Sequence, residues 1–304
     1  MIISVSLNPS IDKSVSIESF NYGSMNRAKD VRYDAGGKAI NLAYVASMLG
    51  LDVKCVGFTR KGGEDIILKR LGDIKHDFIS LPGSIRTNMK LLDLSRGTVT
   101  EVNEPGQAVD EKDLAQALDK IMSCAVEADY IVLTGSVPPG CPKSFYAEVI
   151  ARCGHKCVLD AEGEALELGI RQKPYLIKPN RMELEMLVGR KLNTLREVCS
   201  AANDICARGV SVTAVSLGAE GALLTDSRQT FYAPAIKVNV KSTVGAGDSM
   251  LAGMISGLVD KAPLDEVLRR GVACASASIT HEGTQLMDID TCKSLLKEIT
   301  VERM

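Results

Sequence analysis

The sequence contains no tryptophan, few aromatic residues and no long apolar run. None of its apolar runs approaches the roughly 18 residues that a membrane-spanning helix requires. Its 36 Lys and Arg residues are balanced by 38 Asp and Glu residues, so it also lacks the basic excess on which non-specific nucleic-acid binding depends. We therefore expect neither a membrane nor a nucleic acid among the partners of this protein.

The nine cysteines include no Cys-x-x-Cys pair. Cys153 and Cys157 lie on either side of His155, but no second pair completes a zinc site. The segment Met1–Pro9 lacks the basic region of a signal peptide and reads as a first core strand. These observations favour reduced thiols and a cytoplasmic location.

Several common catalytic motifs are also absent. The chain has no Gly-x-x-x-x-Gly-Lys-Ser/Thr P-loop and no Gly-x-Gly-x-x-Gly after its first strand-like run, which argues against P-loop kinases and the usual dinucleotide oxidoreductases. No His-Glu-x-x-His or Gly-x-Ser-x-Gly motif occurs. The three isolated histidines indicate neither a metal site nor a catalytic triad.

The chain does contain strand-like and helix-like segments in alternation along most of its 304 residues. This order predicts an α/β fold in which a mostly parallel sheet carries helices on both faces. No linker or repeat divides the chain, so we expect a single domain over residues 1–304. The predicted strands are Ile2–Leu7, Val53–Phe58, Tyr130–Thr134, Lys156–Asp160, Tyr175–Ile177 and Val212–Ser216. Amphipathic segments predict helices near 36–50, 63–72, 111–127, 143–153, 180–189 and 194–209.

Two regions break this alternation. Residues 11–31 alternate apolar and polar side chains without a following helix, and residues 87–105 predict a hairpin with its turn at Ser95–Gly97. Each of these strands has one apolar face, so we expect a small sheet that stands away from the main one. We expect this lid both to close over a substrate and to pair with a second subunit.

Residues 241–250, Lys-Ser-Thr-Val-Gly-Ala-Gly-Asp-Ser-Met, place a carboxylate beside very small residues. Gly245, Ala246 and Gly247 let a ligand approach their amides, and the helix predicted over 249–258 has a positive end that suits a phosphate. Asp248 would repel an intact phosphate, but phosphoryl transfer needs a base that accepts the proton of the attacking hydroxyl. We interpret Asp248 as that base; the alternative is an acidic residue that only caps the helix.

A second glycine motif, Asp34-Ala-Gly-Gly-Lys-Ala-Ile-Asn-Leu-Ala43, predicts the start of a helix that ends at Gly50. Apolar residues at helical spacing predict a buried stripe, with Asn41 roughly opposite it and pointing away from the core. Gly36 and Gly37 allow a ligand to approach the backbone, and Asn41 is then available to sugar hydroxyls. The alternative is a tight turn followed by a surface asparagine.

Two arginines, Arg27 and Arg86, fall in or beside the predicted lid among polar neighbours. A guanidinium is a planar fork that binds phosphate through two parallel hydrogen bonds. Both are therefore candidates for an anionic substrate, although most surface arginines have no such role.

The segment Leu176–Glu183 leaves a predicted strand and enters a helix. Asn180 suits the N-cap and Glu183 the N3 position of a capping box. Open α/β sheets bind ligands at this carboxyl edge, so Glu183 is also placed to order Mg²⁺ or its water shell beside a triphosphate. Both interpretations can hold together.

These three motifs, in this order, resemble those of the ribokinase-like sugar kinases, or PfkB family. The two family signatures correspond to 35–41, Ala-Gly-Gly-Lys-Ala-Ile-Asn, and 242–248, Ser-Thr-Val-Gly-Ala-Gly-Asp. The resemblance covers essentially the whole chain and implies a Rossmann-type three-layer sandwich, an ATP- and Mg²⁺-dependent kinase, and a homodimer clasped through the lid. Four more segments resemble the phosphosugar branch of the family (1-phosphofructokinase, tagatose-6-phosphate kinase and the minor 6-phosphofructokinase): 8–12, 134–140, 160–165 and 178–183.

The resemblance also implies roles for individual residues. It makes Asp248 the base and the amides of 245–247 an anion hole. The expected substrate-binding residues are Asp12, Arg27, Gly36, Gly37, Asn41, Arg86, Lys90 and Ser136; the two arginines hold the phosphate already on the sugar, with Lys90 and Ser136 nearby. The expected ATP-binding residues are Lys178, Asn180, Ser216, Gly218 and Gly221. Glu183 is the expected magnesium-associated acid, and carbonyls near Ser242, Val244 and Ser278 form an expected K⁺ site.

Residues 86–90 and 100–106 look more like the fructose 1-phosphate kinases than the tagatose 6-phosphate kinases of this branch. The expected reaction is therefore phosphorylation of fructose 1-phosphate to fructose 1,6-bisphosphate. The alternatives are the other two phosphosugar activities, a kinase of an unphosphorylated sugar, and a non-catalytic sugar sensor. One residue departs from the family pattern: Ala39 replaces the usual glycine after Gly-Gly-Lys, and its methyl group removes some room for the sugar.

Overall fold

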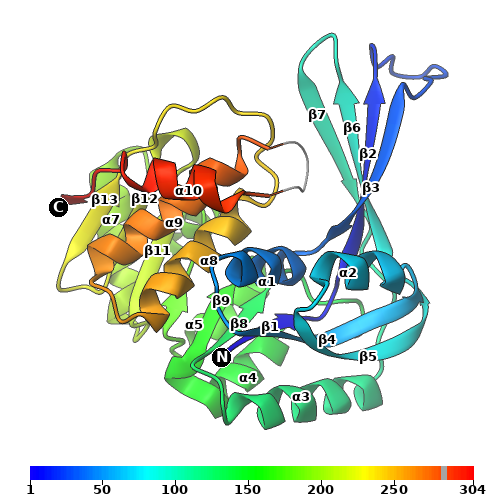
Figure 1. Ribbon diagram of the computed structural model, residues 1–304. Coiled ribbons are helices and arrows are strands. Elements are labelled where there is room, and N and C mark those ends of the chain that lie inside the picture. Colours follow the sequence, from blue (N-terminus) through cyan, green and yellow to red (C-terminus); the bar gives the residue numbers. More distant parts are fainter. Residues whose placement is uncertain (282–285) are drawn as a thin grey trace.

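A long mixed sheet lies between two layers of helices, and a second, smaller sheet projects away from the body (Figure 1). The computed structural model describes residues 1–281 and 286–304. The architecture confirms the expected α/β sandwich with a β-sheet lid.

The main sheet has 10 strands in the order β14-β13-β12-β11-β10-β9-β8-β1-β4-β5. From β11 to β5 all neighbours are parallel, whereas β12, β13 and β14 extend one edge in antiparallel pairs. The parallel strands are buried on both faces, which explains their continuous apolar runs. The strands are β1 (Ile2–Ser6), β4 (Val53–Gly62), β5 (Lys75–Ser84), β8 (Tyr130–Thr134), β9 (Cys157–Asp160), β10 (Leu176–Ile177), β11 (Val212–Ser216), β12 (Ala222–Thr225), β13 (Thr230–Ala233) and β14 (Glu302–Arg303).

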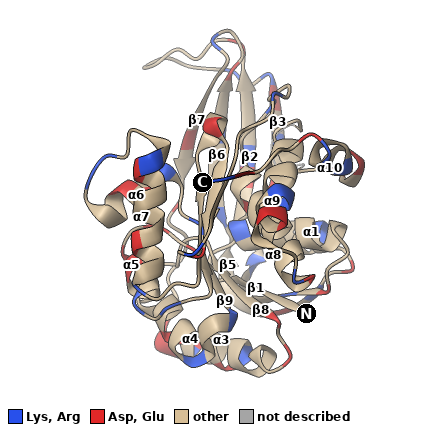
Figure 2. Cartoon of the chain, turned by 90° about the vertical axis from the view of Figure 1, so that its left-hand side faces the viewer, with Lys and Arg blue, Asp and Glu red and all other residues tan. Residues whose placement is uncertain are grey.

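Two hydrophobic cores lie on opposite faces of this sheet. Because side chains alternate along a strand, Ile2 packs into one core and Ile3 into the other. Figure 2 shows the layers from the side, with α5, α6 and α7 on one side of the sheet and α1, α8 and α9 on the other. One layer contains α1 (Lys38–Met48), α2 (Glu64–Leu71), α8 (Ala246–Val259), α9 (Leu264–Ser278) and α10 (Ile289–Leu296). The other contains α3 (Glu111–Ala125), α4 (Phe145–Cys153), α5 (Gly163–Ile170), α6 (Arg181–Val188) and α7 (Leu195–Ala207).

The lid is a 4-stranded sheet in the order β3-β2-β6-β7. Residues directly opposite one another on neighbouring strands share a face of the sheet. One row across the lid is polar and faces the body, and the adjacent row on the other face is largely apolar. The strands are β2 (Ser10–Ile17), β3 (Asp30–Gly36), β6 (Arg86–Asp93) and β7 (Thr98–Asn103). The polar row is Asp34–Asp12–Asn88–Asn103 and the largely apolar row is Tyr33–Lys13–Met89–Val102.

The six predicted core strands and the lid hairpin are confirmed, but several boundaries differ. Residues 34–36 complete β3, so the helix that follows the glycine motif of residues 34–43 starts only at Lys38. Helix α8 starts at Ala246 rather than at 249. The sequence patterns did not identify β5 or the antiparallel strands β12, β13 and β14. None of the helices described is both long and apolar enough to cross a membrane.

Candidate active site

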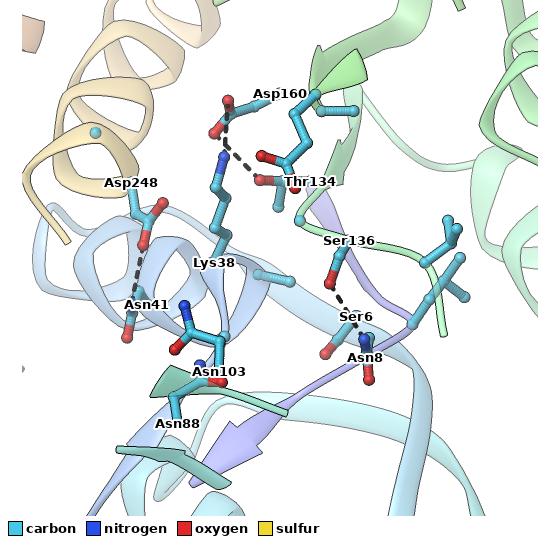
Figure 3. A pocket seen from close by; sticks show the side chains of 18 of the residues that line it. Ser6, Asn8, Lys38, Asn41, Asn88, Asn103, Thr134, Ser136, Asp160 and Asp248 are labelled. Carbon is cyan, nitrogen blue, oxygen red and sulfur yellow. Dashed lines mark hydrogen bonds and ion pairs between the residues drawn. The ribbon is translucent and has the colours of Figure 1, made fainter. Parts of the chain in front are cut away.

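A cavity of about 880 Å³ lies between the carboxyl edge of the main sheet and the lid. Strands β1, β8, β9 and β10 all end at this edge, so the polar residues that follow them converge there (Figure 3). The lid and the start of α8 supply the remaining walls. The cavity therefore joins motifs that are far apart in the chain, as with Asn41 and Asp248, 207 positions apart.

The cavity gathers most of the predicted site residues. Those that line it are Asp12, Gly37, Asn41, Arg86, Lys90, Ser136, Lys178, Asn180, Glu183, Ser216, Val244, Gly245, Gly247 and Asp248. Those outside its lining are Arg27, Gly36, Gly218, Gly221, Ser242, Ala246 and Ser278.

The glycine motif of residues 241–250 forms the start of α8. Gly245 has φ 75°, a left-handed conformation that glycine adopts without strain, and a Cβ there would lie 2.3 Å from Cδ2 of Leu286. The amides of the first helical turn have no acceptor within the helix. The amide of Gly247 therefore remains available at the positive end of the helix dipole, beside the cavity. The Ala246 amide instead donates to the Thr243 carbonyl at 3.3 Å. Ala246 is therefore the weakest member of the expected anion hole.

Asp248 follows in the same turn, with only 6% of its surface exposed. Its Oδ2 accepts a hydrogen bond of 2.8 Å from Nδ2 of Asn41 (Figure 3). Burial raises the pKa of Asp248 to about 6, although Lys38 lowers it. A carboxylate with this pKa is ionised at neutral pH and accepts a proton more readily than an ordinary one, as a general base must.

Asn41 does not point away from the core, contrary to the sequence-based expectation. Helix α8 packs against α1 on the side of Asn41, so that α1 is buried nearly all round. Its Nδ2 is bonded to Asp248, while its Oδ1 is buried without a partner among the described atoms. A free buried acceptor on the wall of the cavity fits a hydroxyl group of a substrate.

The sequence reasoning missed a buried charge cluster around Asp160, the last residue of β9. Its Oδ1 lies 3.3 Å from Nζ of Lys38, and its Oδ2 accepts a hydrogen bond from Thr134 (Figure 3). The same Oδ1 lies 3.4 Å from Nζ of Lys178. Burial alone would raise the pKa of Asp160, but the two lysines outweigh it and hold the pKa below its usual range. In turn, Asp160 raises the pKa of Lys38. The signal available in the sequence was the acidic residue at a strand end.

This cluster makes a prediction about pH. Asp248 must be ionised to act as a base, so kcat/KM should fall as the pH drops through about 6. Lys38 lowers the pKa of Asp248, so Lys38→Met should raise that pKa and move the acid limb of the profile to higher pH. The measurement is kcat/KM for the sugar between about pH 5 and 8 in wild type and variant.

Asp160 provides a control of opposite sign. It raises the pKa of Asp248, so Asp160→Asn should move the acid limb to lower pH. Titration of the substrate is common to all three proteins and cancels in the comparison. An acid limb that stays in place in both variants would mean that Asp248 is not the group observed.

At the lid side of the cavity, Asp12 is held by three donors. Ser10 Oγ lies 3.1 Å and Asn88 Nδ2 3.4 Å from Oδ1, and Nζ of Lys90 lies 2.6 Å from Oδ2. A Cβ on Gly36 would lie 2.2 Å from Oδ1 of Asp12. Gly36 therefore makes room for this carboxylate and does not itself line the cavity.

Arg86 lies at the same end of the cavity. Its Nε donates to the carbonyl of Asn8 at 3.2 Å and its Nη1 to the carbonyl of Glu104 at 3.0 Å. Within the described ranges Arg86 has no carboxylate at ion-pair distance. Ser136 lies beside it, and its Oγ accepts a bond of 3.1 Å from Nδ2 of Asn8 (Figure 3). The arrangement presents a half-buried, unneutralised guanidinium to an anion.

Arg27 does not reach this cavity in the single chain. It is exposed and lies in the loop between β2 and β3, at the far end of the lid. The amide of Lys29 pairs with Ser16, so this loop begins about 13 Å along β2 from Asp12, at the usual rise of a strand. Within one chain the structure thus separates Arg27 from Arg86, contrary to the expectation that both hold the same phosphate.

The opposite end of the cavity carries the third motif. Asn180 and Glu183 form the expected capping box, with bonds of 2.9 Å and 2.8 Å. Burial raises the pKa of Glu183, whose carboxylate also lines the cavity. Mg²⁺ commonly uses one or two carboxylates together with substrate phosphates and water, so a single half-buried glutamate fits this ion.

The expected nucleotide residues lie beside Glu183. Ser216, the last residue of β11, bridges to Asn180 and lines the cavity. Gly218 follows, and a Cβ there would meet no atom within 4 Å, so a ligand can approach its backbone from that side. A Cβ on Gly221 would lie 2.1 Å from the carbonyl of Ala233, so this glycine is required by the packing of β13.

The expected K⁺ residues lie behind the anion hole. The amides of Lys241 and Ser242 both donate to the carbonyl of Ile279, which brings this segment against the end of α9. The hydroxyl of Ser278 is buried without a partner among the described atoms. An orphaned buried oxygen here fits a cation bound by oxygen ligands.

Comparison with known proteins agrees with this geometry. A model of the pfkB family of carbohydrate kinases matches residues 5–292. The chain is 32% identical to 1-phosphofructokinase of Vibrio cholerae, over 100% of this chain and 97% of that protein. It is 34% identical to 1-phosphofructokinase of Rhodobacter capsulatus, over 100% and 98%. It superposes on phosphofructokinase-2 of Escherichia coli in complex with potassium with a TM-score of 0.91 and 28% identity over 98% of each chain. That enzyme has also been solved as a tetrameric inhibited form. The match over nearly the full length, together with the three motifs around one cavity, shows that this chain belongs to the pfkB family of carbohydrate kinases.

Proposed function

We propose that this sugar kinase transfers the γ-phosphoryl group of ATP to fructose 1-phosphate and forms fructose 1,6-bisphosphate. The observation that carries the proposal is Arg86, an unneutralised guanidinium on the wall of the cavity that also contains Asp248. A kinase of an unphosphorylated sugar has no use for a cation at that end. The 1-phosphofructokinases that this chain resembles over its full length support the choice of fructose 1-phosphate.

Each end of the cavity has a task in this reaction. Asp248 accepts the proton of the attacking hydroxyl, and the amide of Gly247 faces the charge that develops on the transferred group. Asp12 and Asn41 hold sugar hydroxyls, while Lys38 and Lys178 bring positive charge close to Asp248. When bound beside Asn180, Glu183 and Ser216, Mg-ATP supplies the phosphoryl group and neutralises part of its charge.

The proposal is tested by ADP release with Mg-ATP and a panel of fructose 1-phosphate, fructose 6-phosphate, tagatose 6-phosphate, fructose and ribose. We expect the highest kcat/KM for fructose 1-phosphate. A higher value for another phosphosugar would keep the mechanism and change the substrate. Turnover of unphosphorylated sugars alone would contradict the role of Arg86, and binding of a sugar without any turnover would identify a sensor.

Fructose 6-phosphate is the second candidate, because phosphofructokinase-2 of E. coli, which shares this fold, has been solved in complex with fructose 6-phosphate. Fructose 1-phosphate and fructose 6-phosphate are nearly pseudo-symmetric and yield the same bisphosphate. The phosphate and the attacking hydroxyl occupy the same two ends of the sugar in both, so the two substrates differ in which ring hydroxyls flank each end, and the substrate panel decides between them.

Removal of Arg86 should raise KM for the phosphosugar and leave KM for ATP nearly unchanged. Arg86→Ala removes a half-buried charge that faces the sugar phosphate, so KM for the phosphosugar should rise at least tenfold, since hydrogen bonds to charged groups contribute about 1.5–3 kcal/mol. KM for ATP should stay within about twofold, because Arg86 lies at the lid end of the cavity. Steady-state kinetics with each substrate varied measure both values. Equal increases in the two KM values would mean that the sugar end has been misplaced.

We further propose a cytoplasmic homodimer in which two lids pack through their apolar faces. Tyr33 and Val102 are 55% and 58% exposed in the single chain, on the lid face that points away from the cavity. Packing of this face against a second copy about a two-fold axis buries them. With that axis perpendicular to the lid strands, the tip of each lid, with Arg27, points towards the base of the other lid, where Arg86 lies.

We also propose that K⁺ is bound by the carbonyls near Ser242, Val244 and Ser278.

A further inference from the structure

A buried ion pair lies on the cavity face of the lid. Asp12 on β2 and Lys90 on β6 are joined at 2.6 Å, and their side chains are only 6% and 7% exposed. Elsewhere on the lid, the pairs Lys29–Glu18 and Arg32–Asp34 are considerably more exposed. Removing two charges from water is unfavourable, so an ion pair with so little solvent contact beside the cavity suggests a functional role rather than a stabilising one.

The positive charge of Lys90 is compensated by Asp12. Asp12 is the carboxylate within ion-pair distance of Lys90 in the part of the chain that the structure describes. Arg86, by contrast, donates to two backbone carbonyls and to Oδ1 of Asn88, and no carboxylate of the described residues forms an ion pair with it. A phosphate near both cations gains more from Arg86 than from a lysine that must first release its own carboxylate.

Asp12 depends on its donors for its orientation. A carboxylate has about four acceptor sites, and three of those on Asp12 are filled by Ser10, Asn88 and Lys90. About one site remains for a hydroxyl in the cavity. Without Lys90, a buried and unpaired carboxylate would face a substrate that carries a phosphate, and it would either turn away or repel that substrate.

We propose that Lys90 is a positioning residue: it compensates the charge of Asp12 and aims the free acceptor of Asp12 at a sugar hydroxyl, and it does not bind the phosphate of the sugar. The proposal refines the substrate site and rests on the proposed function. It replaces the sequence-based expectation that Lys90 lies near the phosphate.

A double-mutant cycle tests the proposal, with Lys90→Met, Asp12→Asn and the double variant assayed at saturating Mg-ATP. Lys90→Met should lower kcat/KM for the phosphosugar by on the order of 10²-fold, the cost of a misplaced substrate, with KM for ATP unchanged. If Lys90 acts through Asp12, the double variant should be no worse than the more impaired single variant. Losses that multiply would mean that Lys90 contacts the substrate independently, and would overturn the proposal.

Further variants exclude a purely structural effect. Lys90→Arg keeps the cation and should recover part of the lost activity, and a cycle with Lys90→Gln, which keeps a donor for Asp12, provides a second reading if Lys90→Met does not fold. The matched control is Lys75→Met, which removes an exposed Lys–Asp pair at 2.8 Å on β5 and should leave kcat/KM unchanged. Failure of the wild type on the whole substrate panel would refute the proposed function; multiplying losses in an active enzyme would refute only the role of Lys90.

Discussion

Replacing Asp248 by asparagine should abolish most turnover while leaving nucleotide binding intact. The variant keeps the shape of the side chain and its contact with Asn41 but removes the group that accepts the proton of the attacking hydroxyl. Loss of a general base lowers kcat by about 10²–10⁴-fold, which corresponds to roughly 3–5 kcal/mol of transition-state stabilisation. Single-turnover kinetics measure the chemical step, and calorimetry with ATP measures binding.

The same substitution should make the protein more stable at neutral pH. The folded-state pKa of Asp248 is about 6, above the ordinary value of 3.8, so the folded state binds this proton more tightly than the unfolded state. Stability is therefore lost as the pH rises from about 4 to about 6, and above that range the buried charge costs on the order of 3 kcal/mol. Asp248→Asn removes this cost, so its melting temperature should exceed that of the wild type by several degrees at pH 7.5.

The stability gain has its own control in pH. Below about pH 4 the wild-type carboxyl is protonated in both states, and the difference in melting temperature should shrink towards zero. An inactive variant that is also less stable at pH 7.5 would indicate disrupted packing rather than a lost base. Full activity in the variant would exclude Asp248 as the base.

The sequence predicted the elements whose pattern is local. Buried parallel strands appear as apolar runs, and the capping box of Asn180 and Glu183 depends on residues three apart, so both were predicted correctly. The carboxyl edge of the sheet then brought the three motifs together, because parallel strands end on the same side.

The misses depend on contacts that are distant in the chain. Asn41 looks like a surface residue within its own helix, and only the packing of α8, more than two hundred positions later, buries it. Asp160 is bound by lysines from two other segments, and Lys90 is neutralised by a strand that lies 78 positions earlier. The periodicity of apolar residues along the chain does not predict contacts between residues so far apart in the sequence. Arg27 and Arg86 both fall in or beside the lid region of the sequence, but the length of a lid strand separates them in space.

Arg27 therefore leads to the second large effect that we expect: two inactive variants should restore activity to each other when mixed. If the lid tip of one subunit acts in the cavity of the other, Arg27→Ala and Asp248→Asn homodimers each lack an essential group in both sites. A hybrid of the two has one site with neither substitution, supplied by Asp248 of one chain and Arg27 of its partner. After subunit exchange at equal concentrations, half of the dimers are hybrids with one intact site each, so about one quarter of wild-type activity should return.

The control for this experiment lies in the same cavity. Arg86 and Asp248 line the cavity of one chain, so a hybrid of Arg86→Ala with Asp248→Asn has one damaged site of each kind and no activity should return. An intact site would form in this hybrid only if Arg86 also acted across the interface. Recovery with Arg27→Ala but not with Arg86→Ala would place the phosphate of the substrate between one arginine from each subunit. Absence of recovery in both mixtures, with subunit exchange confirmed by native mass spectrometry, would leave Arg27 without a role in the neighbouring site. The lid would then contribute only its own cavity face to the substrate, and the apolar face would serve assembly alone.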